Sequence, residues 1–65
     1  MRAYTCYFLN KVGLIAAVET VECAGDDDAR HTALTMLHLS HHHSVEVKDQ
    51  ARLVLNQGRD PTWTD

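Results

Sequence analysis

Histidine is the residue type whose number and spacing suggest chemistry in this chain. Five of the 65 residues are histidine, and four of them fall between positions 38 and 43. On a continuous helix, His38 and His42 would face the same way and could share a metal ion. His31 would lie about 10 Å further along the helix axis, out of reach of that ion. Because zinc sites use three or four protein ligands, His38 and His42 are weak candidate metal ligands, and no metal site or cofactor is assigned.

Two cysteines and three consecutive aspartates are the other residues that could carry chemistry. Cys6 and Cys23 fall on the expected buried face of a hairpin, too far apart for a disulfide and away from any histidine that could activate them. The run Asp26–Asp28 lacks the alternating ligand spacing of calcium loops and favours a helix start. The three glycines are isolated, so no phosphate-binding loop is predicted. No catalytic residue is assigned, and we expect a protein that is not an enzyme.

Composition and charge narrow the classes of partner. The chain is 45% hydrophobic and 23% charged, with a formal net charge of −3, as in globular domains. Its six lysines and arginines are scattered, whereas nucleic-acid binders show a basic patch. No run of about 18 apolar residues could cross a membrane, and no apolar signal segment follows Met1. We therefore expect a cytoplasmic protein with neither a nucleic acid nor a membrane as partner.

A β-hairpin is the element that positions most of these residues. Arg2–Leu9 is rich in aromatic and β-branched residues, Asn10–Gly13 has turn-forming residues at both ends, and Leu14–Cys23 is the predicted return strand. Pairing the strand ends across this turn opposes Phe8 to Ile15, although a bulge at the turn would shift the register.

This register gives the hairpin two faces, because side chains alternate along a strand. The predicted core face contains Tyr4, Cys6, Phe8, Ile15, Ala17, Val21 and Cys23. One helix can cover only one face of a sheet, and the other face is still apolar near the turn. The predicted interaction surface on that second face comprises Tyr7, Leu9, Leu14, Ala16 and Val18.

The second half of the chain predicts a helix and another strand pair. After the Asp26–Asp28 start, a helix is expected from Ala29 to about His41. Its predicted sheet-facing side contains Ala29, Ala33, Met36, Leu37 and Ser40. Ser44–Lys48 alternates as a third strand, and Arg52–Asn56 is a fourth strand whose inward face is ambiguous.

The predicted fold class is α+β, with a ββαββ order and one helix packed on a four-stranded, mainly antiparallel sheet. Two strand orders remain open, 2-1-4-3 and 2-1-3-4. Residues 1–57 are expected to form a single domain, and residues 58–65 a flexible tail. Within that tail, Trp63 either docks on the domain or is exposed.

Four features form a recognisable pattern: a Tyr-rich first strand, an Asx-x-x-Gly turn, an acidic helix start (GDDDA) and a Val-Glu-Val strand. In these features the chain resembles a group of small bacterial ββαββ proteins of unknown function, over roughly residues 4–55. Many of those proteins have Asp at the position of Asn10, and Gly in the turn where this chain has Gln50-Ala51. The resemblance implies a fold and no activity.

We therefore expect a small non-enzymatic interaction or regulatory module. Its partner is an unidentified protein or a second copy of the chain, which would make it a homodimer. The alternative is a metal-responsive protein that uses the His38–His43 cluster, with His41 or His43 supplying a further ligand.

Overall fold

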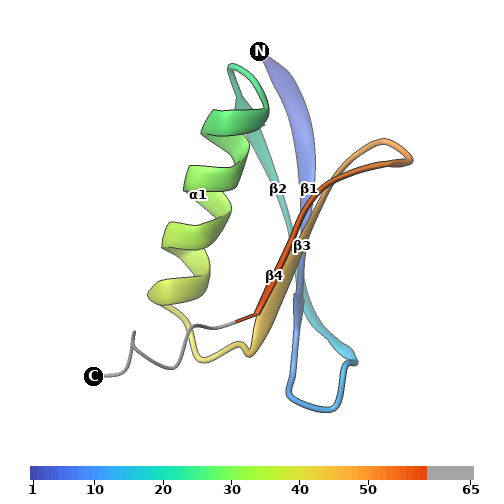
Figure 1. Cartoon of the computed structure of the whole chain (residues 1–65), viewed down its shortest axis with the longest axis vertical. Coiled ribbons are helices and arrows are strands. Elements are labelled where there is room, and N and C mark those ends of the chain that lie inside the picture. Colours follow the sequence, from blue (N-terminus) through green and yellow to red (C-terminus); the bar gives the residue numbers. More distant parts are fainter. Residues whose placement is uncertain (59–65) are drawn as a thin grey trace.

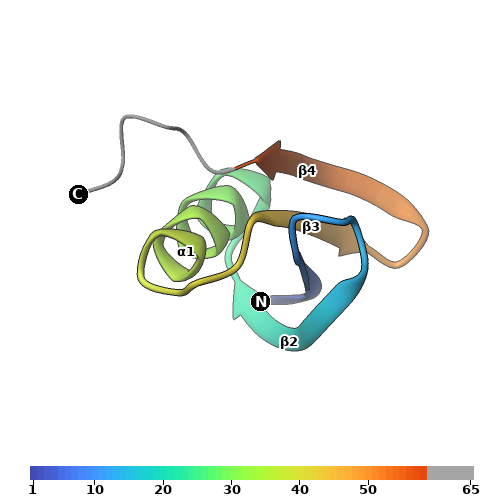
Figure 2. The same cartoon turned by 90° about the horizontal axis from the view of Figure 1, so that it is seen from below.

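Two β-hairpins joined by a helix make up the fold. The computed structural model describes residues 1–58 and places four strands in one sheet, with the helix against one face (Figures 1 and 2). The elements are β1 (Arg2–Leu9), β2 (Ile15–Cys23), α1 (Asp26–His38), β3 (Ser44–Asp49) and β4 (Arg52–Gly58). The predicted ββαββ class is confirmed. Trp63 and the rest of residues 59–65 lie outside the described residues.

The sheet order is β2-β1-β3-β4, and every neighbouring pair is antiparallel. Of the two orders left open by the sequence, this is 2-1-3-4. Val45 and Val47 of β3 are fully buried, whereas β4 carries mostly exposed residues, as expected for a strand in the sheet interior and a strand at its edge. The strand β4 runs to Gly58, two residues beyond the predicted end.

Asn10 holds the turn between β1 and β2. Its Oδ1 accepts hydrogen bonds from the backbone N–H groups of Val12 at 3.0 Å and Leu14 at 3.1 Å. The Gly13 N–H donates to the Asn10 carbonyl at 2.9 Å, and Gly13 has a φ of +88°. This turn is therefore fixed by one amide side chain and one residue in the left-handed region, as the Asn and Gly positions predict.

A Gly13→Ala variant is expected to lose about 1 kcal/mol of unfolding free energy, because an L-residue is strained at this positive φ. An added Cβ at Gly13 would meet no atom within 4 Å, so the cost is conformational and not steric. Gly25→Ala is the matched control, because Gly25 is extended with φ −173° and also has open space around its Cα. Urea denaturation measures both; equal losses would contradict the conformational explanation.

A β-bulge corrects the predicted register of the first hairpin. Phe8 pairs with Ala17 and not with Ile15, which is a shift of two residues that keeps each strand's faces unchanged. The register then shifts again between Phe8 and Leu9, so that Leu9 pairs with Ile15 and Ala16 is the extra residue. Ile15 consequently lies on the side of Leu9, where 59% of its surface is exposed. The predicted core position of Ile15 is therefore wrong.

The helix α1 begins and ends earlier than predicted. Its N-cap is Gly25, which makes no side-chain capping bond, and Asp28 instead accepts a hydrogen bond from the Ala24 N–H at 3.0 Å. At the other end, Ser40 Oγ donates to the Leu37 carbonyl at 2.9 Å, and the helix stops at His38. The predicted end at His41 is wrong, because serine here satisfies a helix-end carbonyl and starts the return to β3.

The core between α1 and the sheet is small. Its buried hydrophobic residues are Tyr4, Cys6, Phe8, Cys23, Ala29, Ala33, Leu37, Val45 and Val47. The predicted sheet-facing side of the helix is largely confirmed, since Ala29, Ala33 and Leu37 are buried and Met36 packs against them. Both cysteines are buried free thiols, as predicted, and burial raises the pKa of Cys6.

Candidate functional site

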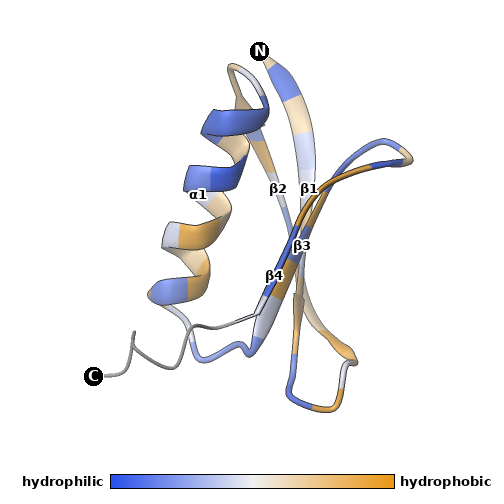
Figure 3. Ribbon diagram, viewed as in Figure 1, coloured by the Kyte–Doolittle hydropathy of each residue, from blue (hydrophilic) through white to orange (hydrophobic). Residues whose placement is uncertain are grey.

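The face of the sheet opposite α1 is not covered by any element that the structure describes (Figure 2). Of the predicted interaction residues, Leu14 is 65% exposed, Val18 is 52% exposed and Ala16 is also exposed. Tyr7 and Leu9 are half-buried beside them on β1. Figure 3 shows hydrophobic residues gathered where the hairpin of β1 and β2 approaches its turn. We call the uncovered side of the sheet the open face.

Two further apolar residues belong to the open face and were missed by the sequence pattern. Ile15 reaches it because of the bulge, and Leu53 of β4 pairs with Lys48 there and is 51% exposed. A second register shift, between Val47 and Lys48, sets the position of Leu53. No periodicity in a run of three apolar residues could have assigned it to a face.

The β3 side of the open face is charged. Glu46 pairs with Tyr7 across β1 and β3, and Lys48 is the next residue of β3 on the same side. The Lys48 Nζ lies 5.9 Å from the centroid of the Tyr7 ring. The open face therefore has an apolar part at the first turn and an acid–base pair on β3, with Tyr7 between them.

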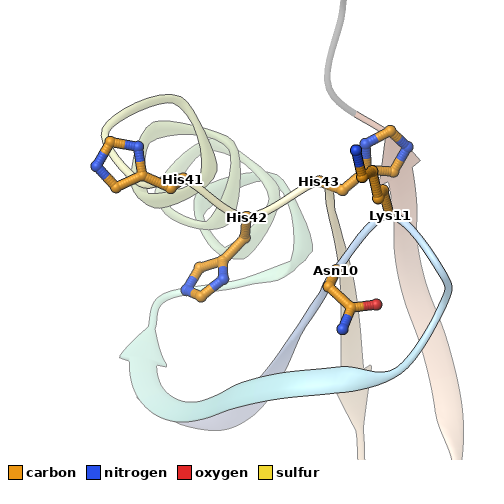
Figure 4. Close-up of a pocket in the computed structure, with 5 residues that line it drawn as sticks. All are labelled: Asn10, Lys11, His41, His42 and His43. Carbon is orange, nitrogen blue, oxygen red and sulfur yellow. The ribbon is translucent and has the colours of Figure 1, made fainter.

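A pocket lies at the end of the molecule where the first turn meets the α1–β3 connection. Its volume is about 400 Å³, and it is lined by Asn10, Lys11, His41, His42 and His43 (Figure 4). The His43 N–H donates to the Leu9 carbonyl at 2.9 Å, and the His42 ring stacks on Phe8 with centroids 5.1 Å apart. We call these five residues the loop pocket.

The histidines do not form the predicted arrangement. Because α1 ends at His38, His38 and His42 are not on one continuous helix, and His42 packs on Phe8 instead of standing free on the helix surface. In Figure 4 the rings of His41, His42 and His43 point in three different directions. Within residues 1–58, no group of three or more His, Cys, Asp or Glu side chains is placed to hold a metal ion. Metal binding by His38 and His42 stays a prediction.

The opposite end of the molecule holds a polar network that joins α1 to three strands. Asp26 accepts hydrogen bonds from the Tyr4 hydroxyl at 2.8 Å and from Arg52 at 2.8 and 2.9 Å. Arg52 also donates to Asp49 at 3.0 Å, and Asp49 pairs with Arg2 as well. These five residues form the end network.

Electrostatics give the end network a structural role. The hydrogen bonds from Arg52 and then Tyr4 hold the pKa of Asp26 well below its usual value. Asp26 and Asp49 raise the pKa of Arg52, and burial raises the pKa of Tyr4, which stays protonated and donates. Each group is thus fixed in the charge state that its partner needs. This network was not predicted from the sequence, because its bonded partners lie up to 47 residues apart and meet only in the observed strand order.

Two surfaces are therefore candidates for function, the open face and the loop pocket. No helix in the described part of the chain is long and apolar enough to cross a membrane. The resemblance to small bacterial ββαββ proteins stays a prediction, because comparison of the chain with known protein families, curated proteins and solved structures finds no match.

Proposed function

We propose that this chain is a cytoplasmic, non-enzymatic interaction module that works as a homodimer through its open face. One observation carries the proposal. Four large apolar residues gather on or beside the open face, and more than half of each is exposed: Leu14, Ile15, Val18 and Leu53. Leu14, Ile15 and Val18 lie together near the first turn, and Leu53 lies across the sheet on β4. Exposed apolar area of this kind on one face of a small domain indicates a binding surface.

The small core favours a second copy of the chain as the partner that covers the open face. A domain of 65 residues buries only about 60% of its unfolded surface, and dimerisation is one way to add what it lacks. Four strands about 4.8 Å apart and about 25 Å long project an area of about 500 Å². Because side chains protrude from the sheet, the accessible area of this face is larger than its projected area and approaches the roughly 800 Å² per partner that a stable interface buries.

The two charges on the β3 side of the open face are self-complementary. Glu46 and Lys48 flank Val47 on the same strand and have opposite signs. A two-fold axis that passes near Val47 would place Glu46 of one copy opposite Lys48 of the other, twice over. Such a pairing aligns two open faces without bringing like charges together, whereas a strongly charged partner would leave one of the two residues opposed by its own sign.

Val18→Lys is expected to weaken dimerisation by at least about ten-fold, because it brings an uncompensated charge into the interface. Sedimentation equilibrium over a range of concentrations measures the effect. Leu39→Lys is the matched control: Leu39 is 78% exposed and follows α1, away from the open face, so this variant should dimerise like the wild type. A wild-type chain that stays monomeric at every concentration would overturn the proposal.

A pair of charge-reversal variants distinguishes a weakened dimer from a misfolded chain. Glu46→Lys should weaken the dimer, because it opposes two lysines, and adding Lys48→Glu should restore it by re-forming the pairs with their signs reversed. Circular dichroism verifies that each variant is folded. If the double variant is no tighter than Glu46→Lys alone, the proposed two-fold arrangement is wrong.

A further inference from the structure

We propose that the loop pocket binds a small phosphate-bearing molecule, with Lys11, His43 and Asn10 as its principal donors. All five lining residues are polar, and four of them carry a basic nitrogen. The volume of about 400 Å³ lies within the range of small-molecule sites and exceeds what a bare phosphate fills. The expected ligand is therefore a phosphate monoester with a small organic part.

The two loops that form the pocket are fixed before any ligand arrives. On the hairpin side, Asn10 Oδ1 accepts two backbone N–H groups of its own turn, which sets the amide orientation and leaves Nδ2 as a donor. On the other side, the His43 N–H is bonded to Leu9, and the His42 N–H is bonded to Ser40 Oγ at 3.2 Å. Such pre-organisation reduces the entropy that binding must overcome.

The chemistry of the lining residues selects an oxyanion. Lys11 supplies three N–H donors and a positive charge, and the imidazoles of His41 and His43 each supply one donor when neutral and two when protonated. Among the described residues that line the pocket there is no carboxylate to compete with a phosphate for these donors. Hydrogen bonds between charged donors and phosphate oxygens are about twice as strong as neutral ones.

The distribution of charge along the described chain agrees with this assignment. Neither residues 7–18 nor residues 37–45, which include both loops, contain Asp or Glu. Asp26 and Asp49 are instead held by arginines in the end network. The negative end of the α1 dipole lies on the pocket side, but the Thr35 and Leu37 carbonyls there already accept hydrogen bonds from Leu39 and Ser40. The net charge of −3 therefore does not describe the local field at the pocket.

Adenosine 5′-monophosphate and inorganic phosphate are the probes for this site. Each is titrated into the full chain at constant ionic strength, with sodium chloride as the blank, and the backbone amide signals are followed by NMR. Signals of residues 10–13 and 41–43 should shift and saturate with the phosphate compounds, and adenosine monophosphate should bind at least as tightly as phosphate. Shifts that chloride reproduces would overturn the proposal.

Charge-matched variants separate a site from general attraction. Lys11→Gln should weaken phosphate binding by about ten-fold, since it removes a charge-assisted hydrogen bond. Arg30→Gln, which removes the same charge from the exposed side of α1, should change affinity by less than about two-fold. His43→Gln should also weaken binding, while His31→Gln on the helix should not. Equal losses in Lys11→Gln and Arg30→Gln would contradict a specific pocket.

Two further experiments test whether the phosphate belongs to a small molecule or to a polymer, and whether the loop pocket binds independently of the open face. A single-stranded RNA of about twelve nucleotides should bind no more tightly per phosphate than the monophosphate; markedly tighter binding would overturn the small-molecule assignment in favour of a polymer. Val18→Lys should bind phosphate like the wild type, because it alters the open face alone. If Val18→Lys abolishes the phosphate-induced shifts while remaining folded, the pocket as described is not an independent site.

Discussion

Leu37→Ala is expected to lower the free energy of unfolding by about 2–5 kcal/mol. Leu37 is fully buried and is the largest side chain that α1 contributes to the core, where the other buried helix residues are Ala29 and Ala33. A domain of this size has little stability to spare, so this one truncation should leave much of the chain unfolded at room temperature. Urea denaturation followed by circular dichroism measures the loss.

Leu39→Ala is the matched control for that prediction. It makes the same chemical change two residues away, at a side chain that is 78% exposed, and it keeps the backbone N–H that bonds to Thr35. Its effect should lie within about 0.5 kcal/mol. Both variants are compared at one protein concentration, because dimerisation would make apparent stability depend on concentration. Similar losses in the two variants would show that α1 packs through a different side.

Asp26→Ala has the second large expected effect, because it removes the centre of the end network. The Tyr4 hydroxyl is fully buried and would lose the partner that now accepts its hydrogen bond, and Arg52 would lose two of its bonds. We expect the thermal midpoint to fall by roughly 5–10 °C. Thermal unfolding followed by circular dichroism measures the change.

Asp27→Ala separates the end network from the helix dipole. Asp27 also lies in the first turn of α1, but its side chain is fully exposed and pairs only with Arg30 among its described partners. Both variants lose one acidic group near the helix N-terminus, and only Asp26→Ala breaks contact with the sheet. A change of less than about 3 °C is expected for Asp27→Ala. Equal shifts would assign the whole effect to the dipole.

The pH dependence of the same pair provides a signed test. The pKa of Asp26 is lowered in the folded state, so its stabilisation is fully present above the unfolded pKa of about 4 and is lost as the pH falls through the lowered folded value. The difference in midpoint between the wild type and Asp26→Ala should therefore shrink steadily below about pH 4. A difference that stays constant down to about pH 2 would show that the contact does not depend on the Asp26 charge.

Local sequence signals were sufficient for most elements of the fold. The aromatic and β-branched residues of Arg2–Leu9 predicted β1, the Asn10 and Gly13 positions predicted the first turn, and the acidic helix start predicted α1. These signals act within a few residues, through side-chain alternation, a left-handed glycine and helix-dipole complementarity. The face alternation of β1 likewise identified Tyr4, Cys6 and Phe8 as core residues.

Features that depend on how the strands pair could not be predicted from these local signals. The bulge that exposes Ile15 is a feature of the pairing between β1 and β2. The strand order depends on whether β3 or β4 pairs with β1, and the observed pairing with β3 places the buried Val45 and Val47 opposite Phe8 and Cys6. The histidine run is evident in the sequence. The Ser40 contact ends α1 before the run, and the rings of His41, His42 and His43 then point in separate directions (Figure 4). Because α1 stops at His38, the histidines that follow do not share a helix face with it.

The histidines therefore mark the boundary between what the sequence determined by itself and what only the tertiary structure decided. The sequence determined their number, their neighbours and the ββαββ order around them, since these follow from residue types and short-range periodicity. Only the tertiary structure brought Lys11 and Asn10 to His43 and assembled Tyr4, Asp26 and Arg52 at the other end. The physical reason is that both groups are joined across strand ends, where position depends on register, bulges and strand order summed over the whole sheet.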